Sequence, residues 1–157
     1  MKRWVVKVGL AGVVLVVAAQ VVPVARTNPA VTRDVAAPVL VAALLRQACY
    51  DCHSRETVWP WYSRVAPVSW LVAHDVNEGR ETVDFSAWDQ YGPRRQAKLL
   101  AEVMESIEEG EMPPWYYVLM HPSAHLGEPA RATLVAWARE MRERSVPSAP
   151  GSTAGTP

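Results

Sequence analysis

The chain has 157 residues, enough for one domain of about 100–150 residues. Half of the residues are hydrophobic and a fifth are charged, which excludes a mainly disordered chain. Lys and Arg number 16 and Asp and Glu also number 16, so no basic surface of the kind that binds nucleic acid is expected. We therefore expect no nucleic-acid partner.

The N-terminus has the layout of an export signal. Three cations, Lys2, Arg3 and Lys7, precede the uncharged apolar run 8–25. The run is close to the roughly 17–25 residues that cross a bilayer as a helix. The positive-inside rule puts the cations in the cytoplasm and the remaining chain outside. We expect residues 1–25 to be a retained single-pass anchor; the alternative is a signal cleaved near 17–19, which releases the chain to the periplasm.

The rest of the chain divides into a spacer at 26–35, a folded domain at 36–144 and a disordered tail at 145–157, rich in Pro, Gly, Ser and Thr. No segment alternates like a strand over a useful length. Apolar periodicity and stop signals predict four helices with long loops, an all-α class. These helices are expected at 38–48, 67–79, 94–109 and 129–144. In the second of them, Gly79 is expected to end the helix, and Trp70, Leu71 and His74 to share one side.

The strongest motif is Cys49-Tyr50-Asp51-Cys52-His53. Two thiols separated by two residues and followed by His form the attachment site of a c-type haem. One helical turn lets both sulfurs reach the two vinyl groups, and His53 can then act as the proximal iron ligand. The expected domain is therefore a small, cytochrome-c-like helical domain around one covalent haem c. Because c-type haem is attached outside the cytoplasmic membrane, the motif and the export signal indicate the same compartment.

Three other interpretations of the two cysteines are weaker. A thioredoxin-like dithiol would follow a strand, whereas here a helix precedes it. A zinc site with His121 and His125 would need a gap far longer than the about 12–20 residues usual between ligand pairs. A plain disulfide between Cys49 and Cys52 is compatible with an oxidising compartment.

The sixth iron ligand is expected to be Met112. Methionine sulfur is a common partner of His in c-type cytochromes, and Gly110-Glu111-Met112-Pro113-Pro114 is a constrained loop after a helix. His121 is the alternative and would give a bis-His centre of lower potential. Met104 and Met141 lie on apolar helix faces and are expected in the core, and Met120 has no special setting.

Aromatic residues form two clusters, one after the haem motif and one after the methionine loop. Core packing is the expected role of most of them. If both motifs close on one haem, both clusters must lie near its edge. The clusters are Trp59, Trp61, Tyr62 and Trp115, Tyr116, Tyr117.

Two long segments, CYDCHSRETVWPWYSRVAPVSWLVAHDVNEGRETVDFSAW and GEMPPWYYVLMHPSAHL, resemble the bacterial haem-binding domain family. The resemblance covers about residues 36–140. It implies a small exported or membrane-anchored protein with one c-type haem, bound covalently at Cys49 and Cys52 with His53 as an axial ligand. The family pattern often has Asn at the position of Asp84, a departure expected to affect a local turn.

These features predict an electron-transfer module on the outer face of the bacterial cytoplasmic membrane, with an unidentified redox protein as partner. The alternative is a haem-based sensor or ligand-binding protein whose sixth position can be vacated. We do not expect an enzyme, because a peroxidase needs a distal base and Arg near open iron, and no second motif supplies them.

Overall fold

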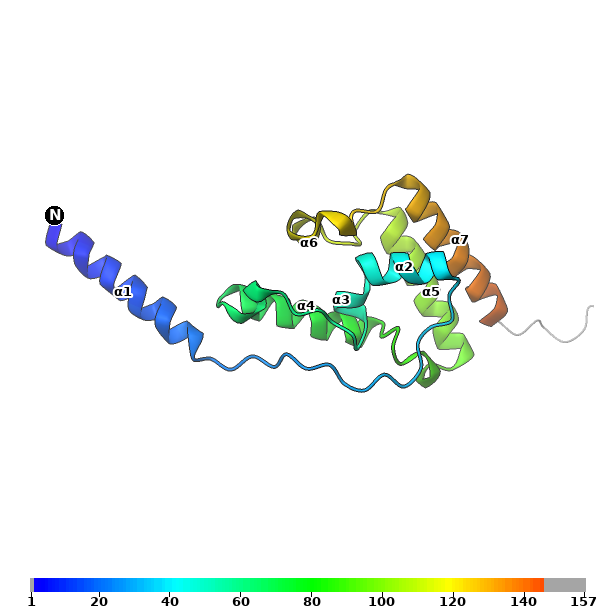
Figure 1. The fold of residues 1–157 in the computed structure, drawn as a ribbon, viewed down its shortest axis with the longest axis horizontal. Coiled ribbons are helices and arrows are strands. Elements are labelled where there is room, and N and C mark those ends of the chain that lie inside the picture. Colours follow the sequence, from blue (N-terminus) through cyan, green and yellow to red (C-terminus); the bar gives the residue numbers. More distant parts are fainter. Residues whose placement is uncertain (1, 146–157) are drawn as a thin grey trace, which may run out of the picture.

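The computed structural model describes residues 2–145, and the predicted all-α class is confirmed there (Figure 1). Within this range the β-structure consists of one isolated β-bridge between Arg33 and Ala87. The α-helices are α1 (Lys2–Gln20), α2 (Val39–Ala48), α3 (Tyr50–His53), α4 (Val68–Thr82), α5 (Pro93–Glu108), α6 (Trp115–Met120) and α7 (Glu128–Ser145). Three 3-10 turns join them: η1 (Trp61–Arg64), η2 (Trp88–Gln90) and η3 (Pro122–Ala124).

Helix α1 is long and apolar enough to be a membrane span or a signal peptide, and none of its residues 3–20 is buried. At a rise of about 1.5 Å per residue, its 19 residues extend about 28 Å, close to the roughly 30 Å of a bilayer core. The helix ends at Gln20, earlier than the predicted run 8–25. Pro23 explains the early end, since proline disfavours helical backbone before it and lacks an amide donor.

The core forms where α5 packs along α7, with α2 against α7 (Figure 1). The predicted bounds 94–109 and 129–144 differ from these helices by one residue at each end. In α5 the apolar residues recur on one face, and that face is buried. Its buried residues are Ala97, Leu99, Leu100, Met104 and Ile107.

One prediction for the second helix is wrong. Gly79 does not end α4, which continues to Thr82. Trp70, Leu71 and His74 are all exposed, and Nε2 of His74 lies 3.3 Å from a carboxylate oxygen of Glu78. The helix instead buries a face of mostly small residues, because it packs closely against α3 and η1. Those residues are Ser69, Ala73, Val76 and Gly79.

The structure has two short helices that the sequence did not predict, α3 and α6. They have four and six residues, too few for a hydrophobic period to stand out. Helix α3 contains motif residues 50–53, and the break between α2 and α3 falls at Cys49, the first residue of the motif. Helix α6 follows the methionine loop and carries the second aromatic cluster.

The expected spacer at 26–35 lies along the domain surface. Arg26 donates to the carbonyl of Ser63 at 3.1 Å, and the backbone amide of Val35 donates to the carbonyl of Phe85 at 2.9 Å. Val35 is buried in the core. The chain between α1 and α2 is thus tied to the domain. At the other end Ser145 closes α7, and residues 146–157 of the predicted tail lie outside the described residues.

Candidate functional site

The haem motif is a single helical turn anchored from its buried side. Cys49 leaves helical geometry between α2 and α3, with φ −124° and ψ −36°. Tyr50 is buried, and its ring stacks on Phe85 at 5.9 Å between centroids. The hydroxyl of Ser54 donates to the Tyr50 carbonyl at 2.7 Å. These contacts fix the turn, so Cys49, Cys52 and His53 have defined positions on its other side.

The ring of His53 is held by two backbone carbonyls at the C-terminal end of α4, one from Gly79 in its last turn and one from Val83 just after it. Its Nδ1 lies 2.9 Å from the Gly79 carbonyl oxygen and 3.2 Å from that of Val83. Because carbonyls only accept hydrogen bonds, Nδ1 must carry the proton, which leaves a lone pair on Nε2. Burial lowers the pKa of His53, and its bonds to the two carbonyls oppose this only in part. The ring is therefore neutral near pH 7 and oriented as a metal ligand requires.

Gly79 allows α4 to approach the motif at this point. A Cβ at Gly79 would lie 2.7 Å from the carbonyl oxygen of Cys52 and 3.1 Å from its Cβ. No side chain fits there, and the same residue supplies a carbonyl to His53. The signal in the sequence was a glycine inside a helical pattern, which can mark either a helix end or a close contact.

Gly79→Ala should destabilise the haem-loaded protein by about 1–3 kcal/mol, because the added methyl group would push α4 from α3. The gain in helix propensity, about 1 kcal/mol, does not offset the clash. Thermal unfolding of the haem-loaded protein followed by circular dichroism would measure the change. Gly92→Ala is the matched control, since a Cβ at Gly92 meets nothing within 4 Å. Equal melting temperatures for the two variants would contradict the close-contact role.

One cavity, of about 240 Å³, is lined by the two cysteines of the motif, by His53 and by Met112. A second cavity, about 80 Å³, is also lined by Cys49, His53 and Met112. Met112 is 38% exposed, and its backbone amide donates to the carbonyl of Ser106 at 3.1 Å. The turn that brings the loop here follows α5 at Gly110, whose φ of 75° favours glycine. Met112 and residues of the motif, which are far apart in the sequence, thus line the same two cavities.

The chemistry of the sulfurs fits covalent attachment to haem. Cys49 and Cys52 are free thiols in the structure, with no disulfide between them. Burial raises the pKa of each to about 12, helped by Cys52 at Cys49 and by Asp75 and Asp51 at Cys52. A thioether carries no charge and suits this setting, whereas a zinc site would need thiolates. Among residues 2–145, no three His, Cys, Asp or Glu side chains gather as ligands for a metal ion.

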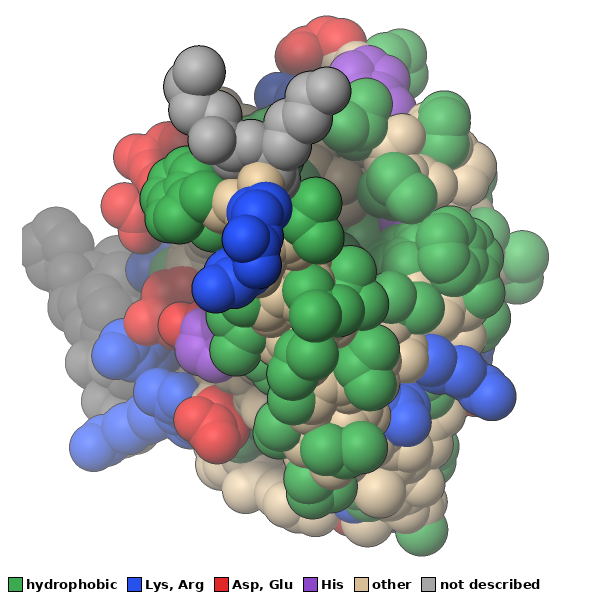
Figure 2. Space-filling view, turned by 90° about the vertical axis from the view of Figure 1, so that its left-hand side faces the viewer, with side chains coloured by type: hydrophobic (Ala, Val, Ile, Leu, Met, Phe, Trp, Pro, Cys, Tyr) green, Lys and Arg blue, Asp and Glu red, His purple; other side chains and the backbone are tan. Residues whose placement is uncertain are grey.

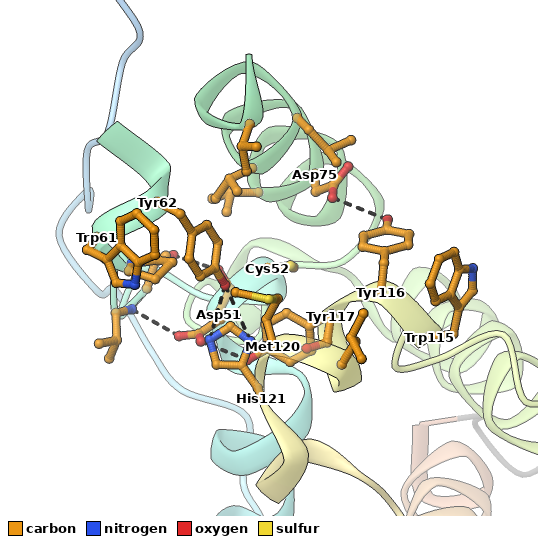
Figure 3. A pocket seen from close by; sticks show the side chains of 18 residues that line it. Asp51, Cys52, Trp61, Tyr62, Asp75, Trp115, Tyr116, Tyr117, Met120 and His121 are labelled. Atoms are coloured by element: carbon orange, nitrogen blue, oxygen red, sulfur yellow. Dashed lines mark hydrogen bonds between the residues drawn. The ribbon is translucent and has the colours of Figure 1, made fainter. Parts of the chain in front are cut away.

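His121 lies in a different cavity, of about 440 Å³, between η1, α4 and α6 (Figure 3). Its ring stacks on Tyr117 at 4.2 Å, and its Nε2 is 3.3 Å from the hydroxyl of Tyr62. His121 does not line the cavities that contain His53. The structure therefore places Met112, and not His121, on the walls of the same cavities as His53.

Both aromatic clusters meet at this larger cavity, since all their members except Trp59 line it (Figure 3). Trp59 instead donates from its indole nitrogen to Asn28 at 3.2 Å. Tyr117 donates to Asp51 at 2.8 Å and Tyr116 to Asp75 at 3.2 Å, which ties α6 to α3 and α4. The two larger cavities adjoin, because they share the walls Asp51, Cys52, Asp75, Tyr116 and Tyr117.

Two arginines, Arg55 and Arg80, form hydrogen bonds that involve residues following the motif, and sequence analysis did not identify these bonds. Arg80 donates to the carbonyl of Ser54 at 2.7 Å and to the hydroxyl of Thr57 at 2.8 Å. Arg55 forms an ion pair with buried Asp84 at 2.7 Å. No local sequence pattern distinguishes these hydrogen-bonded arginines from arginines that face solvent. Their partners are recognised only once the fold is known.

Asp84 organises the turn after α4. Its second oxygen accepts from the backbone amide of Ser86 at 2.9 Å, and the amide of Phe85 donates to the carbonyl of His53 at 2.8 Å. An Asn here could keep the bond to Ser86 but would lose the charge opposite Arg55.

Comparison with known proteins gives a family and no individual relative. The model of the haem-binding domain family matches residues 14–140, from within α1 to within α7. No curated protein and no solved structure matches the chain significantly. The match spans most of the chain and includes the haem motif, the methionine loop and the cavities between them. The chain therefore belongs to the haem-binding domain family.

Proposed function

We propose that the chain is a membrane-tethered, c-type monohaem electron-transfer module with His53 and Met112 as axial ligands. The observation that carries the proposal is the shared cavity: Cys49, Cys52, His53 and Met112, from two distant segments, line one space. Haem bound there supplies an iron centre that takes up and releases one electron.

Each residue has a distinct role in the proposal. Cys49 and Cys52 hold the group through thioether bonds, so that it stays attached in both oxidation states. His53 offers Nε2 while Gly79 and Val83 fix the ring through Nδ1. Met112 supplies a neutral thioether sulfur, which favours ferrous iron and raises the potential. A site with both ligands in place requires little rearrangement on electron transfer.

The tether is helix α1. It carries an apolar span at residues 3–20, and the linker after it is bonded to the domain. A cleaved signal would remove the same helix, so the two outcomes differ in where the mature protein is found.

We expect the full chain, expressed with a haem-attachment system, to stay in the membrane pellet after a high-salt wash and to show a reversible one-electron redox transition. A periplasm-only reporter fused after Pro157 should be active. Recovery of a shortened, soluble haem protein would show that α1 is a cleaved signal. A redox-inactive haem in the membrane fraction would instead overturn the electron-transfer role.

A further inference from the structure

One side of the domain exposes many large apolar side chains. They come from η1 with the residues around it, from the start of α4 and from α6. Trp61 and Trp115 are 74% and 77% exposed. We call this set the apolar face: Val58, Trp61, Val65, Val68, Trp70, Leu71, Trp115, Leu119 and Met120. Figure 2 views the molecule from the side on which α1 lies, and the hydrophobic side chains that cover much of this view include those of α1 in front.

The segments that build the apolar face are almost free of charge. Residues 58–73 contain Arg64 as their sole charged residue, and residues 112–124 contain no Asp, Glu, Lys or Arg. On the other side of the core, α5 and α7 carry six and seven charged residues. The lone charge in these two segments, Arg64, is an exposed cation, which anionic lipid headgroups attract.

Helix α1 ends beside the apolar face. The side chain of Gln20, its last residue, donates to the carbonyl of Ala66 at 3.2 Å and accepts from the Ala66 amide at 3.0 Å. Ala66 lies between η1 and α4. In Figure 1 the start of α4 and helix α6 point to the side of the molecule where α1 ends, and α5 and α7 lie beyond them.

We infer that the apolar face rests in the headgroup region of the bilayer that α1 crosses. The inference depends on the membrane tether of the proposed function. A helix that ends at the membrane surface and is hydrogen-bonded to Ala66 holds this side of the domain close to the lipid. Indole rings favour such interfaces, because one edge is apolar and the other donates a hydrogen bond. The paired Gln20 bonds set the orientation of the domain, and the apolar face contributes buried area.

The test is hydroxyl-radical footprinting of the haem-loaded full chain, one chain per lipid nanodisc of phosphatidylcholine and phosphatidylglycerol. Leu119 on the apolar face is 70% exposed, and Leu40 on α2 is 63% exposed, so they form a matched pair. We expect Leu119 to be oxidised several-fold more slowly than Leu40, with Trp61 and Trp115 protected as well. Equal oxidation of the two leucines would overturn the inference. It would show that lipid does not cover the apolar face and would favour a protein partner there.

The same data separate this inference from the tether. Protection of residues 8–20 with free oxidation of Leu119 would mean that α1 spans the bilayer and the domain stands clear of it. Oxidation of residues 8–20 would mean that the tether itself fails. Protection of Leu119 only in discs that hold two chains would assign the apolar face to a second copy, against the inference.

A charge on the apolar face provides a second test. Leu119→Glu should raise the oxidation of Trp61 and Trp115 several-fold in nanodiscs while the haem spectrum stays unchanged. Leu40→Glu, the matched control, should leave both tryptophans protected. Unchanged protection in Leu119→Glu, with its haem intact, would contradict lipid docking.

Discussion

Replacing both motif cysteines with alanine should remove nearly all covalent haem from the protein. No other cysteine is present in the chain, so no thioether can form. Haem staining after denaturing electrophoresis, and retention of haem through acid-acetone extraction, would measure the loss. The unmodified protein should keep its haem in both assays, and complete extraction from it would contradict covalent attachment.

The same double variant should lose helicity on circular dichroism. The cavities at His53 are walled by α3, α4, α5 and the methionine loop. Without haem these walls lose a large apolar surface to pack on. His125→Ala is a suitable control, because His125 is exposed and lines none of the three cavities described here. A double variant with the helicity of the haem-loaded protein would show that the fold does not depend on the haem.

Met112→Ala should open the sixth position of the iron or let another ligand enter. Either result should lower the reduction potential by on the order of 100 mV, a modest part of the roughly 0.8 V range that axial ligands cover. The weak charge-transfer band of methionine sulfur on ferric haem should disappear. Redox titration and the ferric absorption spectrum measure both effects.

Two control variants make the Met112 test specific. Met120→Ala removes a methionine that lines the larger aromatic cavity, and His121→Ala removes the alternative ligand. Both should retain the charge-transfer band. If the band survives Met112→Ala and is lost in Met120→Ala, Met120 is the sixth ligand. If the unmodified protein lacks the band, the result favours His121 as the sixth ligand.

Much of the fold could be predicted because its signals are local. The amphipathic period of α5 fixed its bounds to within a residue, and the absence of alternation gave the all-α class. The haem motif is local too, since its chemistry depends on two spacings within five residues. Family membership follows from the long aromatic segments that the family model also covers.

The unpredicted parts depend on contacts between distant segments. The sequence alone predicts a helix end at Gly79, whereas the position requires glycine because the carbonyl of Cys52 on another helix approaches it closely. Which face of α4 is buried could not be predicted, because that helix buries small residues and exposes Trp70 and Leu71, the reverse of the usual pattern. The docking of residues 26–35 relies on backbone hydrogen bonds to Phe85 and Ser86, which no side-chain pattern records.

The central claim is that His53 and Met112 together occupy both axial positions of a covalently attached haem. The most direct measurement is the absorption spectrum of the reduced, unmodified protein before and after addition of carbon monoxide at neutral pH. The account predicts a six-coordinate, low-spin spectrum that carbon monoxide leaves unchanged. A five-coordinate spectrum, or rapid conversion to a carbon monoxide complex, would contradict it and favour a ligand-binding sensor.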